Sequence, residues 1–118
     1  MSLPKPVGPY ALYREAGNFI FLSGQIGIDP EKGEMPESVE EQARIALDNV
    51  KRILEFLGLN MENVVKTTIF LTDINDFPKI NEIYAGYFTE PYPARSTVAV
   101  KSLPKNAKIE IEVIALKK

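Results

Sequence analysis

Positions 108–115, Lys-Ile-Glu-Ile-Glu-Val-Ile-Ala, alternate for most of their length between charged and apolar side chains. Because successive side chains of a β-strand point to opposite faces of a sheet, Ile109 and Ile111 would lie on one face, and Glu110 and Glu112 on the other. A carboxylate on a sheet face must be hydrated, paired with a cation or available to a ligand. The pattern therefore predicts a strand with one core face and one face whose charges need a partner.

Five segments have the composition of strands, and two have that of helices. The predicted strands cover residues 10–14, 18–26, 64–71, 95–100 and 108–116. A break at 15–17 joins the first two strands into a hairpin. Ser38 and Glu41 have the spacing of a capping box, so we expect a helix to begin there and to continue as far as Gly58. Asp76 is expected to cap a second helix, which ends before the prolines that follow it.

This order of elements, β-β-α-β-α-β-β, predicts a single α+β domain over residues 1–118, with a mixed sheet and both helices on one face. The opposite face is expected to carry Thr97, Ala99, Glu110 and Ile114, a set too apolar and too oddly charged to lie in water. We therefore expect a second copy of the chain to cover that face.

The composition excludes several kinds of site and partner. The chain has no Cys and no His, so it has no disulfide, thiolate nucleophile, Ser-His-Asp triad or usual metal cage. Its 14 Lys and Arg are scattered and are outnumbered by 16 Asp and Glu, so nucleic acid is not the expected partner. No apolar run approaches the length of a membrane span. We expect a soluble, cytoplasmic protein without a membrane partner or a metal.

Seven short motifs follow one another along the chain. They are Gly8-Pro9-Tyr10, Ser23-Gly24-Gln25, Leu47-Asp48-Asn49-Val50, Asp73-Ile74-Asn75-Asp76-Phe77, Asn81-Glu82-Ile83-Tyr84, Pro93-Ala94-Arg95-Ser96 and Lys108-Ile109-Glu110-Ile111-Glu112. Their order and approximate spacing resemble those of the Rid family of imine and enamine deaminases, also called YjgF-type proteins. The resemblance covers nearly the whole chain. It implies a chorismate-mutase-like α+β fold and homotrimers with the sheets inside, the helices outside and ligand clefts between subunits.

The resemblance also implies catalytic roles for two residues. Arg95 would bind the substrate carboxylate through its planar guanidinium fork. Glu110 would hold a water beside the substrate and could serve as a general base, whereas Glu112 is expected to be structural. From the residues alone, Arg95 could instead form a salt bridge with Glu110 or Glu112, and both interpretations stay open. Tyr84, in the second-helix motif, is better explained by packing on a helix face.

Further residues of these motifs and of the segment before Arg95 would line the substrate cleft. They are Tyr10, Ser23, Gly24, Asn81, Tyr92 and Thr97. Tyr10 would form an aromatic wall and Tyr92 a lid, while Ser23 and Gly24 would bring backbone amides close to the ligand. Tyr10 could instead be a core tyrosine, and Gly24 could mark a β-bulge. Cys is frequent in relatives at the position of Thr97, so we expect the backbone of Thr97 to contact the ligand.

The activity that the resemblance implies is the hydrolysis of reactive 2-imino and 2-enamino acids to 2-keto acids and ammonia. Examples of such substrates are 2-aminoacrylate and 2-iminopropionate, and the reaction needs positioning of water but no organic cofactor. Three alternatives are a non-catalytic regulatory module that binds small carboxylates, a ribonuclease or translation inhibitor, and a chorismate mutase. The acidic balance and the absence of His argue against a ribonuclease, and the single positioned arginine argues against a chorismate mutase.

Overall fold

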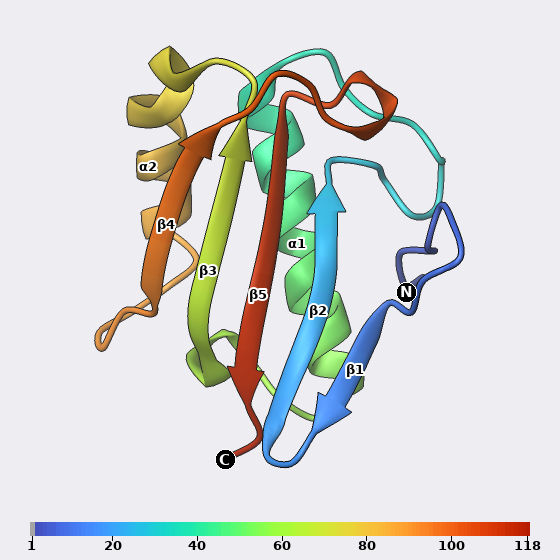
Figure 1. Ribbon diagram of the computed structural model, residues 1–118, viewed down its shortest axis with the longest axis vertical. Helices are drawn as coiled ribbons and strands as arrows, with labels where there is room; N and C mark the ends of the chain where they lie inside the picture. The colour runs from blue at the N-terminus through green and yellow to red at the C-terminus, as the bar shows by residue number, and fades with distance from the viewer. Residues whose placement is uncertain (1) are drawn as a thin grey trace.

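The computed structural model describes residues 2–118, in which two helices cover one face of a five-stranded sheet (Figure 1). The strands are β1 (Tyr13–Ala16), β2 (Phe19–Ile26), β3 (Val64–Leu71), β4 (Ala94–Ala99) and β5 (Ile109–Leu116), and the helices are α1 (Val39–Phe56) and α2 (Phe77–Ala85). This order of elements agrees with the prediction. The predicted α+β fold, a mixed sheet with both helices on one side, is confirmed.

The last strand of the chain, β5, lies in the middle of the sheet. The strand order is β1-β2-β5-β3-β4, and every neighbouring pair is antiparallel except β3 and β4, which are parallel. A parallel pair needs a crossover connection, and α2 supplies it between β3 and β4. β4 is therefore an edge strand, and β3 separates it from β5 (Figure 1).

The core lies between the sheet and the helices. Fully buried side chains there include Ile20, Leu47, Val50, Ile53, Leu54, Ile69, Leu71, Ile80, Ile109 and Ile111. The alternation in β5 thus places Ile109 and Ile111 in the core, as predicted. α1 approaches the chain just after β2 very closely, because a Cβ on Gly27 would lie 2.5 Å from the Cα of Gln42. Gly27 therefore lacks a side chain for the sake of helix packing.

Local sequence signals locate the starts of both helices, but only α1 has a side-chain cap. The Ser38 hydroxyl accepts a hydrogen bond from the backbone N of Glu41 at 3.1 Å, which is the predicted cap of α1. Asp76 occupies the N-cap position of α2, as predicted, but its carboxylate makes no capping hydrogen bond and lies 3.7 Å from the Nζ of Lys79. Asp73, which precedes a short turn before α2, makes the capping bond to Asn75. No helix in residues 2–118 is both long and apolar enough to cross a membrane.

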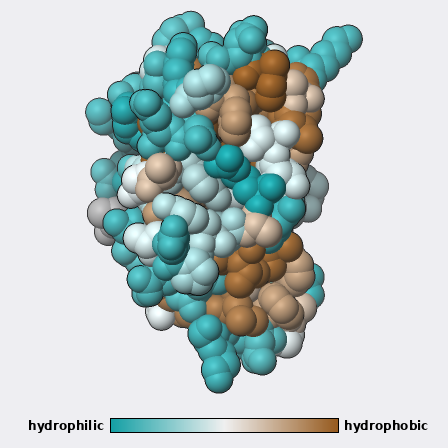
Figure 2. Space-filling model, turned by 90° about the vertical axis from the view of Figure 1, so that its left-hand side faces the viewer, coloured by the Kyte–Doolittle hydropathy of each residue, from teal (hydrophilic) through white to brown (hydrophobic). Residues whose placement is uncertain are grey.

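The side of the sheet away from the helices, which we call the open face, mixes apolar and charged side chains. It carries Phe19, Phe21, Lys66, Thr68, Phe70, Ser96, Val98, Glu110, Glu112 and Ile114. Phe19 and Phe21 are each 44% exposed, and Val98 is 43% exposed. Figure 2 views the molecule from the β4 edge, and apolar residues gather there along the margin on the side of the open face. Large apolar side chains exposed together typically mark an interface.

Thr97 and Ala99 lie on the helix-facing side of β4, which corrects the prediction that they share the open face. Thr97 pairs with Ile69 and Ala99 pairs with Leu71, and both partners are fully buried. The alternation therefore puts Ser96 on the open face. Both sides of this edge strand are partly exposed, so its own sequence does not reveal which side faces the core.

Candidate functional site

The predicted site residues form two separate groups in one chain. Tyr10, Gly24 and Glu110 line a cavity of about 310 Å³ beside the N-terminal segment, which we call the N-terminal cavity. Arg95 and Thr97 lie on the helix-facing side of the edge strand β4. Because Glu110 is on the open face and β3 lies between β4 and β5, the two groups face opposite sides of the sheet.

Gly24 leaves the space that the carboxylate of Glu110 occupies. β2 has a β-bulge between Leu22 and Gln25, which brings this part of the strand out of regular pairing with β5. A Cβ on Gly24 would lie 2.7 Å from the Cδ of Glu110, closer than packing allows. Gly24 therefore belongs to a bulge, as one explanation predicted, and the group that approaches its backbone within the chain is the carboxylate of Glu110.

Glu110 has the surroundings of an acid–base group. Its side chain is half-buried, and this burial raises the pKa of the carboxyl, with a further rise from the nearby charge of Glu112. Glu112 lies two residues further along the same face and is exposed. A carboxyl whose pKa is raised toward neutrality can accept a proton and return it in one reaction cycle.

Tyr10 and Ser23 are fixed by the N-terminal segment. Tyr10 is 45% exposed, which excludes a core tyrosine, and its hydroxyl accepts a hydrogen bond from the backbone N of Val7 at 3.1 Å. Ser23 lies beside the N-terminal cavity, and its hydroxyl donates to the carbonyl of Ala11 at 2.6 Å. These contacts hold the segment before β1 against the bulge in β2, so that it forms one wall of the cavity.

Arg95 places a cation against aromatic rings. Its guanidinium carbon lies 4.7 Å from the centroid of the Tyr84 ring and 5.2 Å from that of Phe77, both on α2. Across residues 2–118 it forms neither an ion pair nor a hydrogen bond. The alternative of a salt bridge to Glu110 or Glu112 within one chain is therefore wrong, because those carboxylates lie on the opposite face of the sheet, two strands away.

Thr97 brings an unpaired hydroxyl to the same side of β4. Its Oγ1 is buried and has no hydrogen-bond partner in the part of the chain that the structure describes. Such groups are rare because burying a polar atom without a partner is costly. The sequence predicts a ligand contact only for the backbone of Thr97, whereas the alternation along β4 puts its hydroxyl on the same side as Arg95.

Two further predicted residues, Asn81 and Tyr92, lie outside the lining of the N-terminal cavity. Asn81 is exposed on α2, and Tyr92 is 57% exposed in the connection between α2 and β4. Tyr84 is buried on α2, as its packing role predicts, but its contact with Arg95 was missed. Phe77 and Tyr84 are seven residues apart and hence lie two turns apart on one side of a helix, but this spacing does not show which strand the two rings face.

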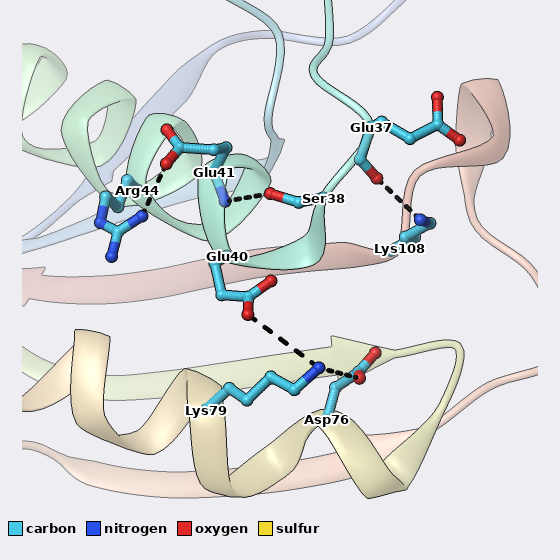
Figure 3. A network of polar contacts seen from close by, with 8 residues as sticks. All are labelled: Glu37, Ser38, Glu40, Glu41, Arg44, Asp76, Lys79 and Lys108. Atoms are coloured by element: carbon cyan, nitrogen blue, oxygen red, sulfur yellow. Dashed lines mark hydrogen bonds and ion pairs between the residues drawn. The ribbon is translucent and has the colours of Figure 1, made fainter.

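A network of polar and charged side chains lies at the starts of α1 and α2, apart from the predicted site residues (Figure 3). Lys79 lies 3.7 Å from Asp76 and 4.0 Å from Glu40, and Lys108 donates a hydrogen bond to the carbonyl of Glu37 at 2.7 Å. A cavity of about 370 Å³ beside it is lined by several of the same charged side chains. Because both lysines already have oxygen partners, this network ties the helices together, and we place the candidate site at Arg95 and Glu110.

Known proteins match this chain along almost its whole length. The family model described as endoribonuclease L-PSP matches residues 1–117. A RutC family protein of Pyrococcus horikoshii is 51% identical over 117 residues, covering 98% of this chain and 93% of that protein. The 2-iminobutanoate/2-iminopropanoate deaminase of Escherichia coli K12 is 49% identical over 120 residues, covering 99% and 94%. The crystal structure of E. coli TdcF with bound serine has a TM-score of 0.92 and 45% identity, covering 98% and 94%. The chain therefore belongs to the endoribonuclease L-PSP family, the Rid or YjgF family that its motifs resemble.

Proposed function

We propose that this protein hydrolyses 2-imino acids, and the enamines that tautomerise to them, to 2-keto acids and ammonia. The observation that carries the proposal is the half-buried guanidinium of Arg95, which has no anionic partner in residues 2–118. A partly buried guanidinium without an anionic partner favours binding of an anion, and the planar donors of the guanidinium match a carboxylate. The name of the E. coli relative specifies two small substrates of this class, each with one carboxylate.

In the proposed mechanism, Arg95 holds the carboxylate and thereby fixes the imine carbon. Glu110 accepts a proton from a water whose oxygen bonds to that carbon, and the C=N double bond becomes a single bond. Glu110 then returns the proton to the nitrogen. The C–N bond breaks as the proton of the new hydroxyl passes to the departing nitrogen and the C–O bond becomes the carbonyl, so that one water is consumed and one ammonia is released. Imines already hydrolyse in water, so positioning and one acid–base group are sufficient.

We further propose that the complete site lies between two copies of the chain in a homotrimer. Arg95 and Glu110 of one chain face opposite sides of the sheet, so they cannot hold the same small substrate. The open face, with Phe19, Phe21 and Val98 exposed, is the surface through which copies would meet. Arg95 of one copy would then lie across a cleft from Glu110 of its neighbour.

The remaining predicted residues take supporting roles in this cleft. Tyr10 would form a wall beside Glu110, and the bulge at Ser23 and Gly24 would offer backbone amides to the substrate. On the side of Arg95, the buried hydroxyl of Thr97 would gain the hydrogen-bond partner that it lacks within the chain. Asn81 and Tyr92, both exposed, would come into contact with ligand only across the cleft, with Tyr92 as its lid. The setting that we propose is the cytoplasm, where dehydratases that use pyridoxal phosphate release such imines.

A regulatory module that binds small carboxylates without turnover is the second candidate. The structure of E. coli TdcF with bound serine favours it, because that relative holds a carboxylate-bearing ligand. Such a module would use Arg95 in the same way but would not need Glu110. Because the family model is described as endoribonuclease L-PSP, an RNA degradation assay is also needed to test for ribonuclease activity.

The deciding experiment measures ammonia and keto-acid release from freshly generated 2-iminopropionate, above the buffer rate. It compares wild type with Arg95→Ala and Glu110→Gln, and each variant is checked for folding by circular dichroism. We expect acceleration by wild type, its loss in Arg95→Ala, and a decrease of about 100-fold or more in Glu110→Gln. If folded wild type accelerates none of several imino acids yet binds keto acids, the regulatory module replaces the deaminase. RNA cleavage that survives in Arg95→Ala would contradict both candidates.

A further inference from the structure

The guanidinium of Arg95 is held by two rings of α2. Its central carbon lies 4.7 Å from the Tyr84 ring centroid and 5.2 Å from that of Phe77, both within the range of cation–π attraction. We propose that Phe77 and Tyr84 are positioning residues that fix Arg95 for the substrate carboxylate. We call these two rings the aromatic cradle. This inference rests on the proposed function, because it takes Arg95 as the carboxylate anchor.

The aromatic cradle can fix the guanidinium of Arg95 without occupying its N–H donors, which an acidic partner could not do. A carboxylate beside Arg95 would fix the guanidinium, but it would also occupy the N–H donors that the substrate needs. A ring attracts the cation through its π face and does not take up those donors. In residues 2–118 no acceptor engages the guanidinium. Arg95 is thus held in place while its donors remain available to a ligand.

The aromatic cradle is itself rigid. The hydroxyl of Tyr84 is 2.8 Å from the Oγ1 of Thr67, a residue with 0% exposure, and the Tyr84 ring lies 4.5 Å from the ring of Phe88. Thr67 is also the residue of β3 that pairs with Arg95 of β4. Backbone pairing, a buried hydrogen bond and the ring contact therefore form a closed loop of contacts around the arginine stem.

Loss of a ring would free the guanidinium without removing its charge. Ordering it again on binding costs free energy, so the affinity for a carboxylate ligand should fall while the chemical step changes little. We expect Phe77→Leu and Tyr84→Leu each to raise the Kd for 2-ketobutyrate, and the KM for the imine, by about three- to tenfold. The kcat should change much less than the KM, because the proton-transfer group Glu110 is untouched.

The test is a double-mutant cycle read out by calorimetric titration of 2-ketobutyrate, the product of 2-iminobutanoate hydrolysis. Phe77→Leu is measured in wild type and in Arg95→Ala, and the primary amide of 2-ketobutyrate is titrated as a ligand without the carboxylate charge. Tyr87→Leu, just past α2, is the matched control, since Tyr87 is a half-buried aromatic whose hydroxyl contacts Asp48 and not Arg95. Phe77 is only partly buried, so its variant is expected to fold even if Tyr84→Leu does not.

The positioning role predicts that Phe77→Leu weakens keto-acid binding in wild type and has no further effect in Arg95→Ala. It also predicts that amide binding and the Tyr87→Leu control change little. Three results would overturn the inference. Phe77→Leu could weaken keto-acid binding equally in wild type and in Arg95→Ala, it could weaken amide binding as much as keto-acid binding, or it could leave keto-acid binding unchanged. A wild type that neither binds keto acids nor turns over imines would instead remove the proposed function, and the substrate role of the rings with it. The ring-current shift of the Arg95 side chain in NMR spectra, and its loss in Phe77→Leu, tests the aromatic cradle without any ligand.

Discussion

The carboxylate of Glu110 lies against the backbone of Gly24, in the space that a side chain at position 24 would fill. The two residues come from β2 and β5, which are neighbours in the sheet. The β-bulge in β2 and the absence of a side chain at Gly24 together decide where this carboxylate lies.

Gly24→Ala should therefore displace Glu110. We expect imine turnover to fall about tenfold or more, and overpacking to lower the free energy of unfolding by about 1–3 kcal/mol. Gly86→Ala is the matched control, because a Cβ on Gly86 would lie at an acceptable 3.4 Å from the carbonyl of Ile83. Turnover and urea denaturation measure the two effects. Full activity in Gly24→Ala would show that the position of the carboxylate does not matter.

The raised pKa of Glu110 makes stability depend on pH. Because the folded protein keeps this proton to higher pH than the unfolded chain, stability falls as pH rises from the ordinary to the raised pKa, and it stays lower above that window. Glu110→Gln removes this effect. In urea titrations, the free energy of unfolding of Glu110→Gln minus that of wild type should be larger at about pH 8 than at about pH 4. Equal gains at both pH values would contradict the raised pKa.

Sites shared between copies can be tested by mixing two inactive variants. Arg95→Ala and Glu110→Gln should each be inactive alone. Unfolding them together in equal amounts and refolding should restore about a quarter of the wild-type rate. Each cleft takes Arg95 from one copy and Glu110 from its neighbour, and each of these two residues is intact in about half of the clefts. Mixing without unfolding is the control. No recovery after confirmed subunit exchange would contradict a site that is shared between Arg95 of one copy and Glu110 of another.

A charge on the open face should prevent assembly. Phe21 is 44% exposed and pairs with Ile114 across the sheet, so Phe21→Glu would bury a charge in the proposed interface. We expect light scattering to show trimers for wild type and monomers for this variant, with loss of turnover. Phe56→Glu is the matched control, since Phe56 is 63% exposed at the end of α1, away from the open face. Trimers of Phe21→Glu would assign the interface to another surface.

The unpaired hydroxyl of Thr97 should contribute to ligand affinity and not to the stability of the fold. Thr97→Val removes a buried polar group and keeps the shape of the side chain, so the free energy of unfolding should stay unchanged or rise by up to about 1 kcal/mol. The Kd for a 2-keto acid should increase severalfold at the same time. A large loss of stability would instead show that the hydroxyl has a structural partner in the assembly.

The sequence was informative where a residue has a local reason for its identity. The alternation of β5 identified its core face, the cap at Ser38 located the start of α1, and Gly24 marks a β-bulge as one of its two explanations predicted. What it lacked was the order of the strands. Arg95 looked like a partner for Glu110 because their segments are close in sequence, yet β3 lies between β4 and β5.

The missing strand order also explains why Thr97 and Ala99 were misplaced and why the contacts of Phe77 and Tyr84 with Arg95 were missed. The side of β4 that Thr97 occupies depends on pairing with β3, a segment far away in the sequence. Phe77 and Tyr84 form the aromatic cradle only because the crossover lays α2 over β4, and a contact between elements is not visible in the periodicity of either one.

The central place of β5 also orders events during synthesis of the protein. Before residues 109–116 have been made, β2 and β3 each lack the neighbour that joins them, so pairing of β1 with β2 and of β3 with β4 would leave two half-sheets with open edges. Those halves can close into one sheet only when the final strand inserts between them. Because Glu110 lies on that strand, neither the fold nor the site can be complete before β5 has been made.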